Sequence, residues 1–330
     1  MLKKWMLAIL ALSISFFLFT ACGDDDSTGP DPVDEFALVA AAGDTYLANY
    51  TTNGGLGVNI SATALFDNLT DGNTANDPFI IDWRSSADYA TKHIKGAVNL
   101  AIGDLVAKVE DGTIPTDKTI VNVCYTGQNA SVATSVLNLL GYEAQNMLYG
   151  MCGVDTSIVK ATNWYNQIKG ADERTLVTDA ATATETHDFP TIDTGEKTAE
   201  AIIKAQFSNI TAGWTVSADA VWDNPSNYFI VNYWGATDYA NPGHIPGAIQ
   251  FTPKTSLLST STLNLLPTDK TIVIYCYTGQ TSAQVTAYLR LLGYDAKSLL
   301  YGVNGFAYNA MAAIGHQYAV PTGDFSAILE

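Results

Sequence analysis

Short apolar runs recur along the chain at positions suited to a buried sheet. Residues 79–81 read Phe-Ile-Ile and residues 229–231 read Phe-Ile-Val, which is typical of strands buried on both faces of a parallel sheet. Residues 119–123 and 271–275 are rich in β-branched side chains, and each of these runs ends directly before a cysteine. The pattern therefore predicts two central strands in each half of the chain.

A helical pattern follows each of these cysteines. Apolar residues at helical spacing mark it, namely Val132, Val136, Leu139 and Leu140 in the first half and Val285, Leu289 and Leu292 in the second. Gly141 and Gly293 come next, where a helix stop belongs. Alternation of strand and helix predicts the α/β class, with two repeated domains that each have a central parallel sheet and helices on both faces.

The second half of the chain repeats the first at a spacing of 152 residues. The matching stretches are 117–121 with 269–273, 124–128 with 276–280, 139–142 with 291–294, and 148–150 with 300–302. Two copies of this length indicate duplication of a whole domain rather than a solenoid. We place domain 1 at residues 36–170, a linker at residues 171–197 and domain 2 at residues 198–330.

The first 21 residues have the pattern of a targeting segment. Lys3 and Lys4 precede an apolar run at residues 6–19, and small residues then lead to Cys22. This order resembles the lipobox of bacterial lipoproteins, which implies a signal peptide at 1–21, a lipid on Cys22 and a flexible acidic tether at 22–35. An uncleaved membrane anchor is the alternative, although the run is short of the ~20 residues that a span needs. Both place the body outside the cytoplasm of a bacterial cell, at the periplasmic or surface side of the envelope.

The amino-acid composition limits the kinds of partner that the protein can bind. The chain has 33 acidic and 16 basic residues, a formal net charge of −17, and 47% hydrophobic residues. This balance indicates a globular body and excludes nucleic acid as a partner, because phosphate binding requires Lys and Arg. The cysteines and histidines lack zinc-like spacing, so no metal site is predicted. If Cys22 holds a lipid, three cysteines remain and cannot all pair within one chain.

The two repeated cysteines are the candidate catalytic residues. Cys124 and Cys276 lie between a buried strand and a helix, where unpaired backbone N–H groups converge and favour negative charge. We therefore expect a stabilised thiolate, with Gly127 and Gly279 permitting the turn. The expected anion-binding loops consist of Tyr125, Thr126, Gly127, Gln128, Asn129 and Ala130, and of Tyr277, Thr278, Gly279, Gln280, Thr281 and Ser282.

These loops and the segments before them resemble the rhodanese family. The matching motifs are Asp82-Trp83-Arg84, Tyr89, residues 93–97 (His-Ile-Lys-Gly-Ala) and the Cys124 loop, with residues 243–248 (Gly-His-Ile-Pro-Gly-Ala) and the Cys276 loop in the second copy. The resemblance implies a sulfurtransferase that holds sulfur as a cysteine persulfide. It also implies a small sulfur-containing donor, a thiol or cyanide acceptor and no cofactor beyond the covalent intermediate.

Departures from the family pattern shape the expected chemistry. Related phosphatases need an arginine six residues after the cysteine, where this chain has Ala130 and Ser282, so phosphatase activity is excluded. Neither loop contains Arg or Lys, which predicts that thiosulfate is a poor donor. In the second copy Asn232 and Trp234 replace the Asp-x-Arg pair. Because Thr281 and Ser282 add hydroxyl groups, we expect Cys276 to be the main sulfur carrier.

Two other function classes stay open from the sequence: a non-catalytic binding or interaction module, and a thiol redox protein that uses Cys152. Cys152 is predicted near the Cys124 loop, either in a disulfide with Cys124 or as a small buried side chain. Asp82 and Arg84 are interpreted as a scaffold ion pair. His93 and His244 are interpreted as structural residues. No protein partner is identified.

Overall fold

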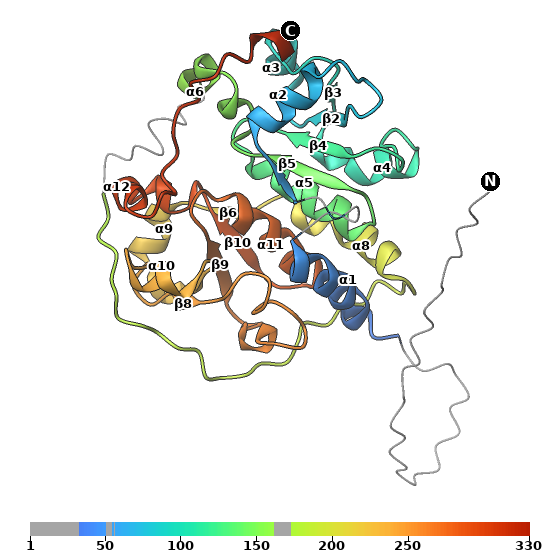
Figure 1. The fold of residues 1–330 in the computed structure, drawn as a ribbon. Helices are drawn as coiled ribbons and strands as arrows, with labels where there is room; N and C mark the ends of the chain where they lie inside the picture. Colours follow the sequence, from blue (N-terminus) through green and yellow to red (C-terminus); the bar gives the residue numbers. More distant parts are fainter. Residues whose placement is uncertain (1–32, 51–54, 56, 162–172) are drawn as a thin grey trace, which may run out of the picture. The chain divides into compact units, whose positions relative to one another are not determined.

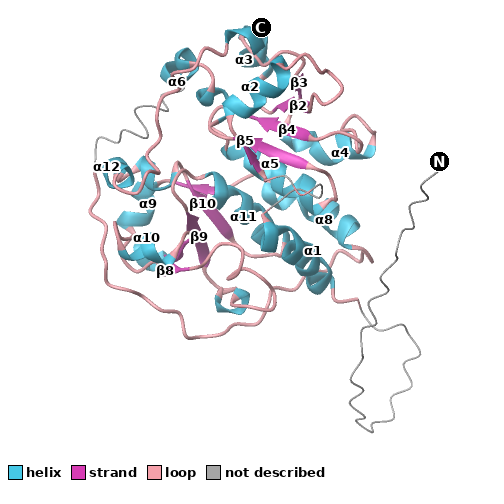
Figure 2. Cartoon of the chain, in the orientation of Figure 1, coloured by secondary structure: helices cyan, strands magenta, loops and turns pink. Residues whose placement is uncertain are grey.

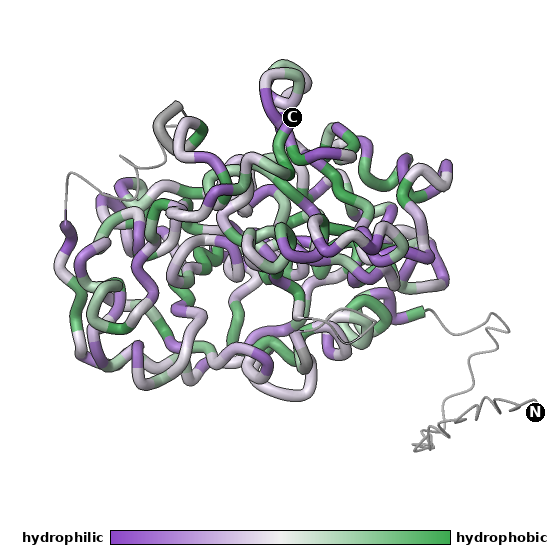
Figure 3. Tube along the Cα trace, turned by 45° about the horizontal axis from the view of Figure 1, so that its top comes forward, coloured by the Kyte–Doolittle hydropathy of each residue, from purple (hydrophilic) through white to green (hydrophobic). Residues whose placement is uncertain are grey.

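The computed structural model describes residues 33–50, 55, 57–161 and 173–330 (Figure 1). The predicted signal peptide, the predicted lipidation site Cys22 and nearly all of the predicted tether lie outside the described residues. Figure 2 shows strands enclosed by helices in both halves of the chain. Figure 3 shows short hydrophobic stretches interspersed with hydrophilic ones along the trace.

The first repeat is built on a parallel five-stranded sheet of order β1-β5-β4-β2-β3. Its strands are β1 (Asn59–Ile60), β2 (Phe79–Asp82), β3 (Val98–Asn99), β4 (Ile120–Val123) and β5 (Ala144–Met147). Its helices are α1 (Glu35–Asn49), α2 (Ala62–Thr70), α3 (Ser86–Thr91), α4 (Leu105–Glu110), α5 (Gln128–Leu139) and α6 (Thr156–Ala161), with short 3₁₀ turns η1 (Ile102–Asp104) and η2 (Gly150–Gly153).

The second repeat has the same topology, with a parallel sheet of order β6-β10-β9-β7-β8. Its strands are β6 (Thr215–Val216), β7 (Tyr228–Asn232), β8 (Ile249–Gln250), β9 (Thr271–Tyr275) and β10 (Ala296–Leu299). Its helices are α8 (Ala199–Gln206), α9 (Ala218–Asp223), α10 (Ala236–Ala240), α11 (Gln280–Leu291) and α12 (Tyr308–Ala312), and its 3₁₀ turns are η3 (Phe207–Ile210), η4 (Pro225–Asn227), η5 (Leu263–Leu265), η6 (Gly302–Gly305) and η7 (Ser326–Ile328). The predicted α/β class and parallel sheets are confirmed in both repeats.

The helices after the cysteines end as the sequence predicts. Gly141 has φ +91° and its N–H donates to Asn138 O, while Tyr142 N–H donates to Leu137 O. This pair of hydrogen bonds is the Schellman arrangement, in which a residue in the left-handed region satisfies the last carbonyls of a helix. Gly293 repeats it in α11 with φ +92°. Each helix therefore returns to its sheet in a defined direction, into β5 or β10.

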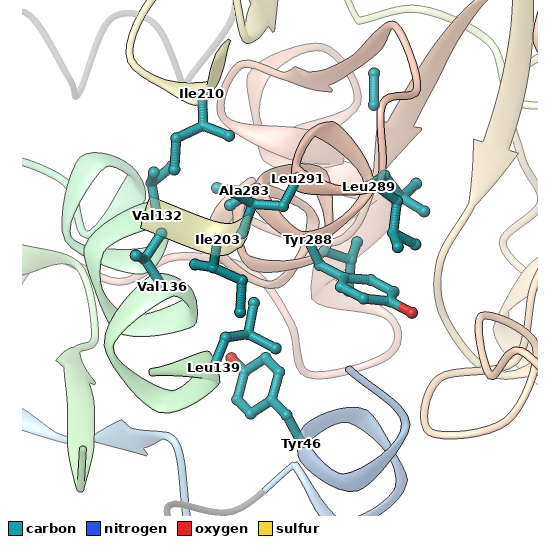
Figure 4. Packing of buried hydrophobic residues seen from close by; sticks show 14 of the residues in the cluster. Tyr46, Val132, Val136, Leu139, Ile203, Ile210, Ala283, Tyr288, Leu289 and Leu291 are labelled. Atoms are coloured by element: carbon teal, nitrogen blue, oxygen red, sulfur yellow. The ribbon is translucent and has the colours of Figure 1, made fainter. Parts of the chain in front are cut away.

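Helices α5 and α11 pack against each other and join the two repeats. Figure 4 shows Val132 and Val136 of α5 in the same hydrophobic cluster as Ala283 and Leu291 of α11, with Ile203 of α8 beside them. Almost every side chain of α5 and α11 is buried, including polar ones such as Ser131, Ser135, Gln284 and Thr286. One hydrophobic cluster therefore spans both repeats, while each repeat also has a cluster on the other side of its sheet.

Chain segments at both ends cross between the repeats. In α1, the Asp44 carboxylate accepts hydrogen bonds from Ser259 N–H (2.7 Å) and Ser259 O–H (2.5 Å) of the second repeat. At the other end, Leu329 forms an antiparallel bridge with Ile94 of the first repeat. The segment from residue 173 to α8 passes around the second repeat (yellow-green in Figure 1). Residues 34–330 accordingly form one compact unit.

Candidate functional site

Each repeated cysteine lies directly after the central strand of its sheet. Cys124 follows β4, and its Sγ accepts hydrogen bonds from the backbone N–H of Gly127 (3.1 Å) and Ala130 (3.4 Å). Gly127 has φ +80°, which turns the loop amides toward the sulfur without the strain that a side chain would add. The loop and the first turn of α5 therefore point N–H groups at Sγ, as the sequence predicts.

Cys276 follows β9 in the same way and has one additional polar neighbour. Ser282 N–H donates to Cys276 Sγ at 3.3 Å, and the Ser282 hydroxyl oxygen lies 3.5 Å from the same sulfur. That hydroxyl also contacts Ser298 Oγ at 2.8 Å, which fixes its position. Ala130, which has no hydroxyl group, stands at the equivalent place in the first repeat, so this contact has no counterpart at Cys124 among the described residues.

Burial changes the expected acidity of Cys124. Its side chain is 3% exposed, and desolvation raises the pKa of the thiol above its ordinary value, outweighing the backbone N–H groups of Ala130, Thr126, Gly127 and Asn129 that lower it. The expectation of a stabilised thiolate is therefore wrong for Cys124. The amides are in place, but the loss of water around the anion has the larger effect.

An ordinary cysteine thiol has a pKa of ~8.5, and its alkylation rate levels off above that pH. We expect the rate at which iodoacetamide alkylates Cys124 to go on rising at higher pH. A raised pKa means that the thiolate, the reactive form, is populated only at higher pH. Peptide-level mass spectrometry of Cys276→Ser protein between pH 6 and pH 10 measures this rate. The urea-unfolded protein is the control, and a plateau in the folded protein at lower pH than in the unfolded protein would contradict the prediction.

The Cys124 sulfur opens into a cleft of about 640 Å³. Six lining residues belong to the first repeat: Asp88, Cys124, Tyr125, Thr126, Gln128 and Asn129. Four belong to the second repeat: Trp214, Thr215, Leu300 and Tyr301. The opposite repeat therefore completes this site.

The Cys276 sulfur opens into a cleft of about 380 Å³ that is completed in the same way. Lining residues from its own repeat are Tyr233, Trp234, Gly235, Pro253, Lys254, Cys276, Tyr277 and Thr281. The first repeat adds Tyr50, Gly57, Val58 and Asn59. Lys254, the charged residue in this set, comes from outside the cysteine loop.

Two glutamines connect the cysteine loops across the boundary between the repeats. The Gln128 side-chain oxygen accepts a hydrogen bond from Tyr301 N–H at 3.0 Å, and the Gln280 oxygen accepts one from Tyr149 N–H at 2.9 Å. The amide nitrogen of each glutamine donates to the threonine of its own loop, Thr126 or Thr278, at 3.1 Å. Both predicted loop glutamines therefore hold their loop against the other repeat.

The tyrosine that follows each cysteine is tethered by an aspartate. Tyr125 O–H donates to the Asp88 carboxylate, and Tyr277 O–H donates to Asp238 Oδ2 at 2.5 Å. Hydrogen bonds from Ser85 and Tyr125 lower the pKa of Asp88. Asp88 is consequently an anion in the Cys124 cleft at neutral pH.

The remaining motif residues support the scaffold. Arg84 and Asp82 form a buried ion pair at 2.7 Å, as interpreted from the sequence, and Arg84 also donates to Lys92 O. His93 Nδ1 lies 2.9 Å from Tyr89 O, and His244 Nδ1 lies 2.9 Å from Tyr239 O. Neither histidine is among the residues that line the Cys124 and Cys276 clefts, which agrees with a structural role.

Cys152 lies beside the Cys124 loop, as predicted. Its N–H donates to Tyr125 O at 2.9 Å, and its carbonyl accepts from Tyr318 O–H at 2.8 Å. Cys124, Cys152 and Cys276 are all buried, and no disulfide joins any of them within the described part of the chain. The Cys124–Cys152 disulfide is therefore not present, and Cys152 is a small buried side chain packed against Tyr318.

Sequence reasoning missed the residues that reach each site from elsewhere. Trp214 and Tyr301 at Cys124, and Tyr50 and Asn59 at Cys276, come from the opposite repeat. Lys254 comes from the turn after β8. None of them belongs to a local motif, because their place depends on how the repeats pack. The 152-residue offset does not relate them either, because Thr215 at the start of β6 and Asn59 at the start of β1 are 215 − 59 = 156 residues apart.

The fold and the two sites define a protein of tandem parallel α/β domains with a cysteine loop at each site. A family model described as the rhodanese-like domain matches residues 61–154 and 218–309. The chain belongs to the rhodanese-like domain family. None of the curated proteins matches this chain.

Several solved structures resemble parts of the chain. SSP1007 from Staphylococcus saprophyticus subsp. saprophyticus is 22% identical, covering 28% of this chain and 88% of that chain at a TM-score of 0.26. A rhodanese-like domain protein from Staphylococcus aureus is 19% identical, covering 28% and 86% at a TM-score of 0.26. A thiosulfate sulfurtransferase from Pseudomonas aeruginosa is 15% identical, covering 79% of this chain and 46% of that chain at a TM-score of 0.31.

Two kinds of feature are absent from the described residues. No helix there combines the length and the apolar character that a membrane crossing needs. In the same ranges, no group of three or more His, Cys, Asp or Glu side chains is arranged to hold a metal ion.

Proposed function

We propose that the protein is a sulfurtransferase that moves sulfane sulfur through a persulfide on Cys276, with Cys124 as a second carrier. The observation that supports this most is a cysteine sulfur that accepts loop N–H hydrogen bonds at the foot of an open cleft, twice in one chain. Membership of the rhodanese-like family agrees with it. A buried thiol with only a structural role would not need an opening to solvent.

The proposed reaction has two displacement steps. The cysteine thiolate attacks the transferable sulfur of a donor, and the bond that holds this sulfur breaks: an S–S bond in thiosulfate or polysulfide, and the C–S bond in mercaptopyruvate. The leaving group, sulfite, a shorter polysulfide or the enolate of pyruvate, departs with the bonding electrons. The product is Cys–S–S⁻, whose terminal sulfur a thiolate or cyanide then removes, regenerating the cysteine thiolate. No cofactor is required, because the covalent intermediate holds the sulfur.

The loop amides stabilise charge in this scheme. The N–H groups of Gly127 and Ala130, or of Ser282, are fixed before the reaction and need no reorganisation when an anion forms. At Cys276 the thiol faces the Ser282 oxygen at 3.5 Å, and in this proposal the hydroxyl turns to donate to the anion once the persulfide has formed. The second repeat is therefore the better carrier in this proposal.

Intact-mass analysis of the purified protein tests the proposal. After incubation with thiosulfate, polysulfide or mercaptopyruvate in turn, we expect a gain of one sulfur atom per carrier cysteine, and cyanide should remove it. The Cys124→Ser/Cys276→Ser double variant is the control. If no donor adds reversible sulfur to the wild-type protein, it is not a sulfurtransferase for these donor classes and the binding-module alternative is favoured.

The N-terminal sequence supports a proposal about location. We propose that lipid on Cys22 anchors the protein to the bacterial envelope, with the two domains outside the cytoplasm. Metabolic labelling with a fatty acid should mark the protein, and Cys22→Ala should abolish the label. A mature protein whose N-terminus is not residue 22 would exclude the anchor.

A further inference from the structure

The Cys276 loop is held by a short segment of its own repeat. Val303 N–H donates to Cys276 O at 3.0 Å, and Asn304 N–H donates to Tyr277 O at 3.0 Å. Gly302 lies so close to the loop that a Cβ there would be 2.3 Å from Cys276 O. This segment therefore fixes the backbone of the loop, which in turn aims its N–H groups at the sulfur.

The glutamine of the other cysteine loop holds the start of this segment. Gln128 Oε1 accepts a hydrogen bond at 3.0 Å from the N–H of Tyr301, the residue directly before Gly302. The same oxygen packs against the Cys276 loop itself, since a Cβ on Gly279 would lie 2.5 Å from it. Gln128 is buried, so little water competes for these contacts. Two contacts from the first repeat thus reach the loop of the second.

The arrangement at Cys124 is the reciprocal one. Met151 N–H donates to Cys124 O at 2.8 Å, and this segment begins at Tyr149. Gln280 Oε1 accepts a hydrogen bond from Tyr149 N–H at 2.9 Å, and a Cβ on Gly127 would lie 2.3 Å from that oxygen. Each glutamine oxygen therefore contacts the site of the opposite cysteine, while the glutamine nitrogen donates within its own loop.

We propose that the two glutamines are crossed positioning residues: Gln128 sets the reactive shape of the Cys276 loop, and Gln280 sets that of the Cys124 loop. A buried N–H that loses its acceptor must find another, so the segment that holds the opposite loop shifts when the glutamine oxygen is removed. The loop amides then no longer all point at the sulfur, and the thiolate loses hydrogen-bond donors. The consequence for persulfide formation rests on the proposed function, whereas the consequence for thiol reactivity does not.

The wall of the Cys276 cleft does not depend on Gln128. The ring of Tyr277 lies between those of Trp234, with centroids 4.8 Å apart, and His316, with centroids 3.7 Å apart. Its hydroxyl donates to Asp238. Since this tyrosine lines the cleft, the sulfur stays shielded when the loop loses its support. The loss of N–H donors, and not a gain of water, then decides the reactivity of the thiol.

Replacing Gln128 by methionine removes the acceptor oxygen and keeps a side chain of similar length. We expect the rate at which iodoacetamide alkylates Cys276 at pH 7 to fall at least about fivefold, and the rate at Cys124 in the same molecules to fall less than about twofold. At pH 10.5, well above the pKa of ~8.5 of an ordinary thiol, the Cys276 rate should return to within about twofold of wild type. A loop that merely opened would react faster at both pH values. Peptide-level mass spectrometry of initial rates measures both cysteines.

Gln280→Met should give the reverse pattern at pH 7, with the larger fall at Cys124. Asn138→Leu is the matched control for Gln128→Met, because it removes a buried amide from the same helix. The Asn138 amide donates to Thr134 O and Ala144 O of its own repeat, so both alkylation rates should stay within about twofold of wild type. Thermal melting confirms that each variant is folded, and one folded glutamine variant is sufficient for the test.

An equal or larger fall at the cysteine of the substituted loop would overturn crossed positioning even if persulfides form. So would a Cys276 rate that Gln128→Met leaves unchanged, or one that Asn138→Leu lowers as much. Crossed falls in alkylation without persulfide formation from any donor would overturn only the proposed function. Because both cysteines are measured in one molecule, a general loss of stability changes both rates alike and is distinguished from the crossed effect.

Discussion

Replacing Cys276 by serine is expected to reduce sulfur transfer at least tenfold, whereas replacing Cys124 by serine should reduce it less than twofold. Removal of a covalent nucleophile typically lowers the turnover rate by orders of magnitude. The turnover that remains in each variant therefore measures transfer through the other cysteine. One difference favours Cys276: the Ser282 hydroxyl oxygen lies 3.5 Å from its sulfur, where the first repeat has the alanine side chain of Ala130. Turnover from a sulfane donor to cyanide, measured as thiocyanate formed, gives the comparison.

The Cys276→Ser and Cys124→Ser variants serve as controls for each other. Both remove one buried thiol from equivalent positions, so equal thermal stability of the two proteins separates chemistry from folding. If Cys276→Ser retains full turnover while Cys124→Ser loses it, the assignment of the main carrier is reversed.

Replacing Gly302 by alanine is expected to destabilise the protein by at least about 3 kcal/mol, a fall in melting temperature of roughly 6–12 °C for a chain of this size. Gly302 has φ +57°, and a Cβ there would lie 2.3 Å from Cys276 O and 2.7 Å from the N atoms of Thr278 and Gly279. All three contacts are backbone atoms of the catalytic loop. The loop must therefore move, and the loss of stability should be accompanied by loss of persulfide formation at Cys276.

Gly315→Ala is the matched control for this substitution. Gly315 has φ +72° in the same repeat, but a Cβ at this position would meet nothing within 4 Å. Its alanine variant therefore measures only the cost of the left-handed backbone, about 1–2 kcal/mol. Calorimetry on both variants decides the matter: if they melt at the same temperature, the close approach of Gly302 to the loop contributes nothing.

The α/β class, the duplication and the position of both cysteines could be predicted because each depends on local pattern. The β-branched run before Cys276 became β9, and the apolar spacing after it became α11. Gly293 ended that helix because its left-handed φ satisfies the last carbonyls. Such features need only neighbours within a few residues.

The pairing of the repeats could not be predicted. Ser131 and Gln284 are polar, which would normally place them on a solvated helix face, yet both are buried where α5 meets α11. Lys254 could not be predicted either, because its turn after β8 lies next to the Cys276 cleft only through the tertiary structure. The raised pKa of Cys124 also depends on total burial, which no loop motif encodes.

The reciprocal hydrogen bonds of Gln128 and Gln280 have the form of a two-fold symmetric dimer interface, in which residue i of one partner meets residue j of the other and the reverse. In a dimer of identical subunits, every substitution would appear at both sites at once. In a single chain, each site can change alone while the symmetric contact stays intact. Ala130 and Ser282 can therefore differ beside one shared boundary, and a fused pair can give its two cysteine sulfurs different neighbours, which a homodimer of either half could not.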